Sequence, residues 1–229
     1  MKRVVIVLLC FVTFSNAHAQ NEEALVKAVR AKLDRVTDYR ANGRMVINVP
    51  FIQAPPSEVT VYYKKPNEFK VVKKDGISIL PKGGVGINLG SILASDQFTI
   101  VPAGTAVVAG VTTKVVKLLP QTETGDLILL TLYIDEKAAL VRRSKVTTRE
   151  NGSYEIDLTY GKWAAWGLPD NVVFSFNAKA YKLPKGITFE YEKSGTPQPA
   201  TPKDTQGKIQ ITYSSYAINK GLSAAVFTK

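Results

Sequence analysis

The pattern of apolar residues changes once along this chain, from a helical period to a period of two. Between Asn21 and Val36 the apolar residues lie three or four positions apart, which predicts an amphipathic helix with Asn21 as its N-cap. From Asp38 onward apolar and polar residues alternate, as is typical of β-strands with one buried face. The helix is therefore expected to lay its apolar stripe on the sheet that follows.

Alternating segments of this kind make up most of the remaining chain. We expect strands at Arg44–Val49, Glu58–Lys64, Phe69–Lys74, Ile77–Leu80, Lys114–Leu119, Leu127–Asp135, Leu140–Thr148, Tyr154–Tyr160, Val172–Ala178, Gly186–Glu192 and Lys208–Tyr216. Turn residues such as Lys65-Pro66-Asn67 and Asn151-Gly152 separate neighbours, so the sheet should be antiparallel. Leu127–Ile134 is apolar on both faces, which predicts a central strand that is covered on both sides.

Two stretches do not follow these periods. The segment from Pro81 to Gly110 contains several glycines around a short predicted helix at Ser91–Ala94, and it is either a mobile flap or an ordinary long connection. Residues 193–207 combine prolines with small polar residues, which predicts a mobile linker.

These elements predict an α+β fold class with one long antiparallel sheet and few helices. Such a sheet has two ways to cover its apolar face. It can pair with a second sheet, or it can curve and let helices cover the concave side.

The first residues of the chain have the order of a secretory signal peptide. Lys2 and Arg3 precede an apolar run of 11 residues, and Ala17-His18-Ala19 provides a small-residue cleavage site before Gln20. The run is too short to span a bilayer, and no later segment is long and apolar enough to do so. We therefore predict a signal peptide at 1–19 and an exported single domain at 20–229 without a transmembrane segment.

Removal of the signal peptide would also remove the one cysteine and the one histidine, Cys10 and His18. The mature chain would then have no disulfide, no thiolate and no imidazole for metal binding or catalysis near neutral pH. No cofactor is predicted. The formal net charge of +11 is compatible with an anionic membrane surface, an acidic partner or simple solubility. Nucleic acid is not an expected partner, because no basic run is interleaved with aromatic residues.

Three stretches, in this order, resemble the LolA/LolB-like superfamily of bacterial periplasmic lipoprotein carriers, which includes outer-membrane lipoprotein-sorting proteins. They are Lys32–Ala41 at the helix-to-strand junction, Val61–Phe69 with Lys74-Asp75-Gly76 after it, and Val115–Pro120 followed by Leu132–Asp135 and Asn151-Gly152. The resemblance extends over roughly Asn21 to Phe176, and none of the stretches is a catalytic signature.

The resemblance implies a curved, incomplete half-barrel with helices over its concave face and a periplasmic carrier function. The cargo would be acyl chains of lipoproteins or other lipids, with inner-membrane release machinery and an outer-membrane acceptor as partners. The expected cavity residues are Val46, Val59, Val61, Phe69, Val71, Leu118, Leu130, Leu132 and Ile134, and the expected lid residues are Lys65, Ile92, Leu93 and Phe98.

This chain departs from the family pattern at two places. The residue before the turn proline is typically an arginine that contacts the lid, whereas here it is Lys65, which cannot make the same bidentate contacts. The region after Ala178 is also longer than in the simplest carriers, and we expect an extra hairpin there.

Two other functions are compatible with the same residues. The carboxylate pairs Glu190 with Glu192 and Asp135 with Glu136 would suit a glycosidase, but they fall on predicted solvent-facing positions, so we predict no enzyme. The alternative is a binding or structural protein of the envelope, built on the same scaffold with an interior filled by its own side chains.

Overall fold

The computed structural model describes residues 14–49, 52–73, 89–93, 97–122, 125–150, 152–177 and 206–227. Its elements are α2 (Phe14–Asp34), β1 (Asp38–Val49), β2 (Ile52–Lys64), β3 (Glu68–Lys73), α3 (Leu89–Ile92), β4 (Phe98–Val108), β5 (Val111–Pro120), β6 (Leu127–Asp135), β7 (Leu140–Thr148), β8 (Gly152–Thr159), the 3-10 turn η1 (Ala164–Trp166), β9 (Asn171–Asn177), β10 (Gln206–Ile218) and the 3-10 turn η2 (Ala224–Val226).

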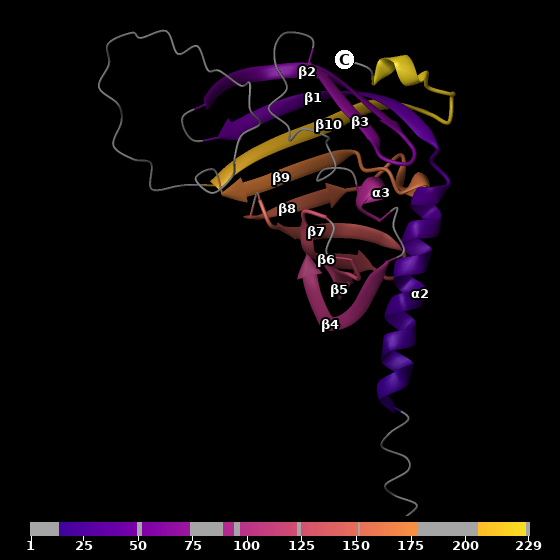
Figure 1. Cartoon of the computed structure of the whole chain (residues 1–229). Helices are drawn as coiled ribbons and strands as arrows, with labels where there is room; N and C mark the ends of the chain where they lie inside the picture. Colours follow the sequence, from indigo (N-terminus) through magenta and orange to yellow (C-terminus); the bar gives the residue numbers. More distant parts are fainter. Residues whose placement is uncertain are drawn as a thin grey trace, which may run out of the picture.

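The ten strands form one antiparallel sheet in the order β3-β2-β1-β10-β9-β8-β7-β6-β5-β4. The sheet is strongly curved and does not close, since β3 and β4 remain as its two edges (Figure 1). The predicted fold class, an α+β half-barrel with helices on the concave side, is confirmed. A curved sheet is the solution that leaves a single apolar face for the helices to cover.

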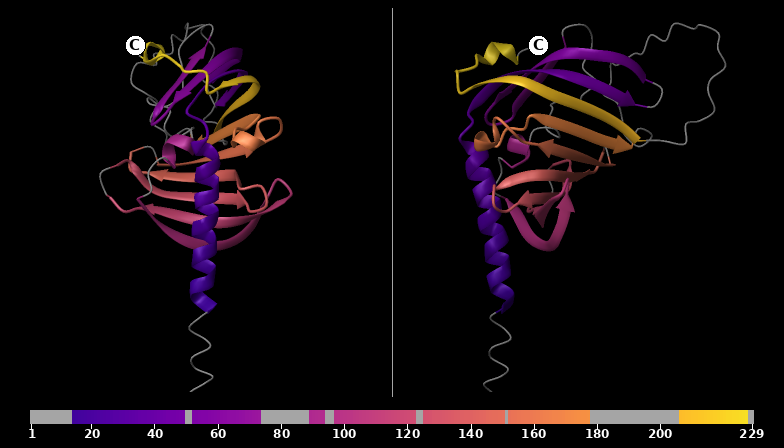
Figure 2. Two further views of the ribbon diagram at one scale, coloured as in Figure 1. Left: turned by 90° about the vertical axis from the view of Figure 1, so that its right-hand side faces the viewer. Right: turned by 180° about the vertical axis from the view of Figure 1, so that it is seen from behind.

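Helix α2 crosses the strands of the β4–β8 half of the sheet, with α3 on one side of it and η1 on the other (Figure 2). Its buried side chains Leu25, Val26 and Val29 recur at helical spacing. The predicted cap is wrong, because α2 begins at Phe14 and Asn21 lies within it. Among the described residues, no helix combines the length and apolar character needed to cross a bilayer.

Most strand predictions agree with the structure, and β6 and β7 have the predicted bounds. The position predicted for Leu127–Ile134 is wrong: β6 is the third strand from the β4 edge, and Ile128 is 43% exposed. Strand β4 was not predicted at all. Pro102 and Gly104 obscure its alternation, because the register shifts between Pro102 and Thr105.

The predicted extra hairpin after Ala178 is also corrected by the structure. Strand β10 pairs with β1 along one edge and with β9 along the other, so it joins the two halves of the sheet. Gly43 allows the close approach of β1 to β10, because a Cβ atom there would lie 2.6 Å from the carbonyl oxygen of Thr212. Predicted strands Ile77–Leu80 and Gly186–Glu192 lie outside the described residues, as do the signal peptide up to residue 13 and most of the 193–207 linker.

Candidate functional site

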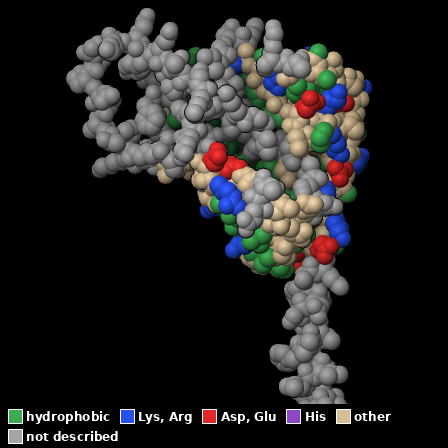
Figure 3. All heavy atoms as spheres, in the orientation of Figure 1, with side chains coloured by type: hydrophobic (Ala, Val, Ile, Leu, Met, Phe, Trp, Pro, Cys, Tyr) green, Lys and Arg blue, Asp and Glu red, His purple; other side chains and the backbone are tan. Residues whose placement is uncertain are grey.

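The face of the sheet that α2 and α3 cover is called the inner face here. Alternate residues of the strands point toward it, and they form one hydrophobic cluster with the apolar stripe of α2 and with Leu89, Ile92 and Leu93 around α3. Hydrophobic side chains line the hollow between the two halves of the sheet (Figure 3). The opposite, outer face carries polar and charged residues, including the ion pair of Arg143 with Asp157 at 2.6 Å.

Most of the predicted cavity residues lie on this inner face. Six of them are buried: Val59, Val61, Leu118, Leu130, Leu132 and Ile134. Phe69 and Val71 on the edge strand β3 are partly buried against the same cluster. The structure brings together residues from opposite halves of the sheet, because α2 and α3 fill the space between them.

The prediction for Val46 is wrong. Its neighbours Met45 and Ile47 are buried on the inner face, whereas Val46 is 40% exposed. Side chains alternate between the two faces of a strand, so Val46 points to the outer face. The alternation of Arg44–Val49 alone did not indicate which set of residues faces inward, and only the position of the helices decides this.

Many inner-face residues were not predicted as site residues. They come mainly from β1, β8, β9 and β10: Tyr39, Met45, Ile156, Phe174, Ile209 and Ile211. The available signal was the alternation of Lys208–Tyr216, which indicates a strand with one buried face. Because this segment was expected in a separate hairpin, its inward-facing residues were not expected at the site.

The predicted lid residues fall on three different elements. Ile92 and Leu93 are buried at α3, which begins two residues before the predicted helix. Phe98 is not part of a lid: it is the first residue of β4, where it pairs with Pro120. Lys65 lies in the turn between β2 and β3 and reaches the C-terminal end of α2.

Two cavities lie where α2 ends and α3 begins, and Leu33 and Gly90 line both of them. One has a volume of about 170 Å³ and is also lined by Asp34, Tyr63 and Lys65. The other has about 40 Å³ and lies deeper among the aromatic residues Tyr39, Phe69, Tyr160, Tyr213 and Tyr216. We call this end of the inner face the aromatic mouth.

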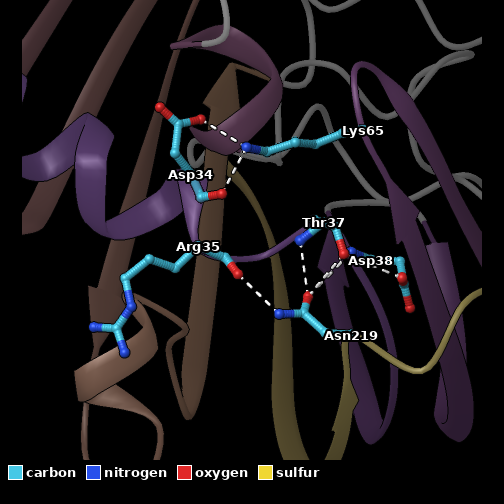
Figure 4. A network of polar contacts seen from close by, with 6 residues as sticks. All are labelled: Asp34, Arg35, Thr37, Asp38, Lys65 and Asn219. Atoms are coloured by element: carbon cyan, nitrogen blue, oxygen red, sulfur yellow. Dashed lines mark hydrogen bonds and ion pairs between the residues drawn. The ribbon is translucent and has the colours of Figure 1, made fainter.

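Lys65 lines the larger cavity, and its side chain reaches Asp34 at the end of α2 (Figure 4). Its Nζ atom donates hydrogen bonds to the backbone oxygen of Asp34 at 2.8 Å and to its Oδ1 atom at 2.7 Å. A cation is favourable at a helix C-terminus, where the last carbonyl groups carry partial negative charge. Lys65 therefore links the β2–β3 turn to the end of α2 by an ion pair that is partly exposed to solvent.

Asn219 fixes the chain between α2 and β1 from the other side (Figure 4). Its Oδ1 atom accepts hydrogen bonds from the backbone N–H of Thr37 at 2.8 Å and from Thr37 Oγ1 at 3.0 Å. Its Nδ2 atom donates to the backbone oxygen of Arg35 at 2.8 Å. The C-terminal end of α2 is thus anchored by two elements that are distant in sequence.

The tyrosine hydroxyls of the aromatic mouth remain protonated at neutral pH. Burial raises the pKa of Tyr39 and Tyr216 well above its usual value, and nearby tyrosines add to both shifts. Burial also raises the pKa of Tyr63, to about 12. Their rings extend the apolar surface of the mouth, and the Tyr216 hydroxyl donates a hydrogen bond to the backbone oxygen of Pro169 at 2.9 Å.

The carboxylates that could serve an enzyme are not arranged as a catalytic pair in the described part of the chain. Asp135 forms an ion pair with Arg142 at 2.8 Å, and the adjacent Glu136 is exposed. Glu190 and Glu192 lie outside the described residues. A groove of about 310 Å³ at the opposite end of β8 and β9 has a mixed lining, in which Lys145, Glu155 and Ser175 accompany Phe176.

No protein family model matches this chain, and no curated protein matches it. Solved structures do match its fold. The chain is similar to a LolA superfamily protein from Nitrosomonas europaea, with a TM-score of 0.58, 8% identity and coverage of 89% of this chain and 97% of that one. It is also similar to a putative outer membrane lipoprotein-sorting protein domain from Vibrio parahaemolyticus, with a TM-score of 0.55, 7% identity and coverage of 89% and 95%.

A third similar structure is a DUF1329 family protein from Desulfovibrio piger, with a TM-score of 0.52, 11% identity and coverage of 90% and 96%. The chain therefore has the LolA-like fold that the sequence resemblance implies, over nearly its whole length. Identities this low establish the fold and leave the activity to be argued from the site.

Proposed function

We propose that this protein is a periplasmic carrier that binds acyl chains of lipoproteins or other lipids on its inner face and transfers them toward the outer membrane. The observation that carries the proposal is the continuous apolar inner face of the sheet. The order of the first 19 residues supports export of the mature chain across the inner membrane.

The physical requirement for such a carrier is an apolar lining that replaces the membrane interior. Each buried methylene contributes about 0.8 kcal/mol, so a long acyl chain leaves a bilayer for water at a cost on the order of 10 kcal/mol. Aliphatic and aromatic side chains of an open, curved sheet meet this requirement without any catalytic group. Release from an inner-membrane donor and delivery to an outer-membrane acceptor would each need a contact at the aromatic mouth.

In the described part of the chain, the space for an acyl chain at the aromatic mouth is small. The two cavities of about 40 and 170 Å³ are smaller than the roughly 300–1,000 Å³ of typical ligand pockets. Loading would therefore require α3, and with it part of α2, to move away from the sheet. Lys65 would act as a latch for this movement, because it joins α2 to the β2–β3 turn.

The same small volumes favour the second candidate function, an envelope binding or structural protein with a filled interior. Leu118, Leu130 and Leu132 are fully buried, as they would be in a permanent core. Native mass spectrometry after mild purification separates the two functions. A carrier is expected to retain lipid or to bind a fluorescent fatty acid, whereas a protein with a permanently filled interior would do neither.

Two adjacent valines of β3 provide a matched test of the binding face. Val71 faces the inner cluster and Val72 faces outward with 40% exposure. Val71→Thr places a hydroxyl group among apolar atoms, so we expect about tenfold weaker binding of a fluorescent fatty acid. Val72→Thr should leave binding unchanged. Equal effects of the two substitutions would contradict binding at the inner face.

The latch can be tested through the kinetics of binding. Lys65→Gln removes a half-exposed ion pair, whose contribution is expected to be below about 1 kcal/mol, so fatty-acid association should become about two- to fivefold faster. High salt should have the same effect on the unmodified protein. The control is Lys64→Gln, because Lys64 donates to the backbone oxygen of Leu222 rather than to α2. An unchanged association rate for Lys65→Gln would exclude the latch but not the carrier.

A further inference from the structure

The two tryptophans of the chain, Trp163 and Trp166, lie together at η1, beside the C-terminal end of α2. Each ring is partly buried against the hydrophobic cluster and partly open to solvent. The ring of Trp163 packs on Tyr216, with 4.7 Å between the centroids. Indole rings that are apolar on one side and wet on the other are characteristic of surfaces that contact a membrane interface.

Cations accompany both rings. The Cζ atom of Arg35 lies 5.0 Å from the centre of the Trp166 ring, and Lys162 Nζ lies 6.0 Å from the centre of the Trp163 ring. The Arg35 guanidinium points away from Asp34 and Asn219 (Figure 4), and it donates to the backbone oxygen of Ala165 at 3.3 Å. Neither cation forms an ion pair with a carboxylate of the described residues. We call the set of Arg35, Lys162, Trp163 and Trp166 the tryptophan rim.

The tryptophan rim adjoins the aromatic mouth. Gly167, Leu168 and Pro169, which follow η1 directly, line the deeper cavity together with Tyr216. The carboxylates next to the rim in sequence are Asp34, which pairs with Lys65, and Asp170, whose Oδ2 atom accepts a hydrogen bond from the Lys162 backbone N–H. The stem of Lys32 lies against Gly167, and its Nζ atom donates to the backbone oxygen of Ala138. The net charge of this region is therefore positive, as is the formal net charge of the whole chain, +11.

We propose that the tryptophan rim docks this protein onto an anionic lipid bilayer. The indole rings would settle at the level of the head groups, and Arg35 and Lys162 would lie against lipid phosphates. Such docking places the aromatic mouth at the membrane surface, where a hydrocarbon chain need not cross water. The docking does not depend on whether the interior takes up lipid, so it can be tested separately from the carrier function.

The intrinsic fluorescence of the protein reports on this surface alone, because the chain has no tryptophan elsewhere. On addition of vesicles containing phosphatidylglycerol, we expect a blue shift of the emission and quenching by brominated acyl chains. Pure phosphatidylcholine vesicles should produce a much weaker response. Added salt should reverse most of the binding, since the cations act through the surface potential.

Charge variants locate the docking surface. Arg35→Gln and Lys162→Gln are each expected to weaken co-sedimentation with the anionic vesicles about fivefold, as expected for loss of one cation near the membrane. The matched controls are Arg44→Gln and Lys208→Gln, which remove exposed cations from the outer face of β1 and β10. These controls should bind nearly as well as the unmodified protein.

Three results would overturn the proposal. One is an unchanged emission spectrum in the presence of anionic vesicles. Another is an equal loss of binding in the rim variants and the controls, which would indicate attraction by net charge without a defined surface. The third is that the rim variants still bind vesicles as the unmodified protein does but no longer bind an acidic protein of the envelope. Circular dichroism of each variant would show that the fold is retained.

Discussion

At the scale of single residues, Gly167 shows how closely the end of η1 is matched to α2. Its φ angle is +70°, in the left-handed region, and it ends the turn that presents both tryptophans. A Cβ atom at this position would lie 3.2 Å from Leu33 Cδ2 and 3.4 Å from Lys32 Cγ. Both the backbone conformation and the close approach of the helix therefore favour glycine here.

This predicts a specific difference between two glycines with the same backbone conformation. Gly167→Ala should lower the free energy of unfolding by about 2–3 kcal/mol, through left-handed strain plus displacement of Leu33. Gly152→Ala has the same φ of +70° with open space around it, so strain alone should cost about 1 kcal/mol. Chemical denaturation of both variants measures the difference. Equal losses in the two variants would mean that the α2 side chains next to Gly167 shift at no cost in free energy.

At the scale of elements, the junction between α2 and β1 is held by the C-terminal turn after β10. Asn219, at a φ of +55°, connects this turn to Arg35 and Thr37 through its amide group. The carboxylate of Asp38 accepts hydrogen bonds from the backbone N–H groups of Lys220 and Gly221. The start of β1 and the turn after β10 therefore stabilise each other.

Substitutions at Asn219 separate hydrogen bonding from backbone strain. Asn219→Gly removes the side chain without strain and should cost about 2 kcal/mol of unfolding free energy. Asn219→Ala should cost about 1 kcal/mol more, because alanine is strained at this φ. Hydrogen exchange of the Thr37 amide is expected to accelerate in both variants. A glycine variant with native stability and native exchange at Thr37 would show that the junction holds without Asn219.

At the scale of the whole molecule, the buried tyrosines of the aromatic mouth couple stability to alkaline pH. Burial raises the pKa of Tyr39, Tyr63, Tyr160, Tyr213 and Tyr216 in the folded state. A pKa raised by folding stabilises the protein fully below the unfolded value, which is about 10 for tyrosine. This stabilisation is lost as the pH rises from there through the folded-state pKa.

We therefore expect the protein to lose stability steeply above about pH 10. In a titration followed by tyrosinate absorbance, these buried tyrosines should ionise only together with unfolding. Tyr213→Phe should make the alkaline loss of stability less steep, since it removes one of the coupled groups. Reversible ionisation of all ten tyrosines near pH 10, with the fold intact, would contradict this expectation.

Much of the local structure follows from the sequence because strand periodicity is a local property. The bounds of β6 and β7, the stripe of α2 and the turn at Lys65 were all predictable from neighbouring residues. The segment Lys32–Ala41 and the stretches after it also indicated the LolA-like fold. Strand β4 was hidden because Pro102 and Gly104 interrupt its alternation, and a break in periodicity cannot be told from a loop by sequence alone.

What the sequence by itself determined is which residues alternate and where most of the strands lie. The tertiary structure alone decided that β10 lies between β1 and β9, that Val46 faces outward, and that Trp166 meets Arg35. The physical reason is that strand pairing and the choice of buried face depend on contacts between residues far apart in the chain. Alternation has two equivalent phases, and only the packing of α2 and α3 selects one of them.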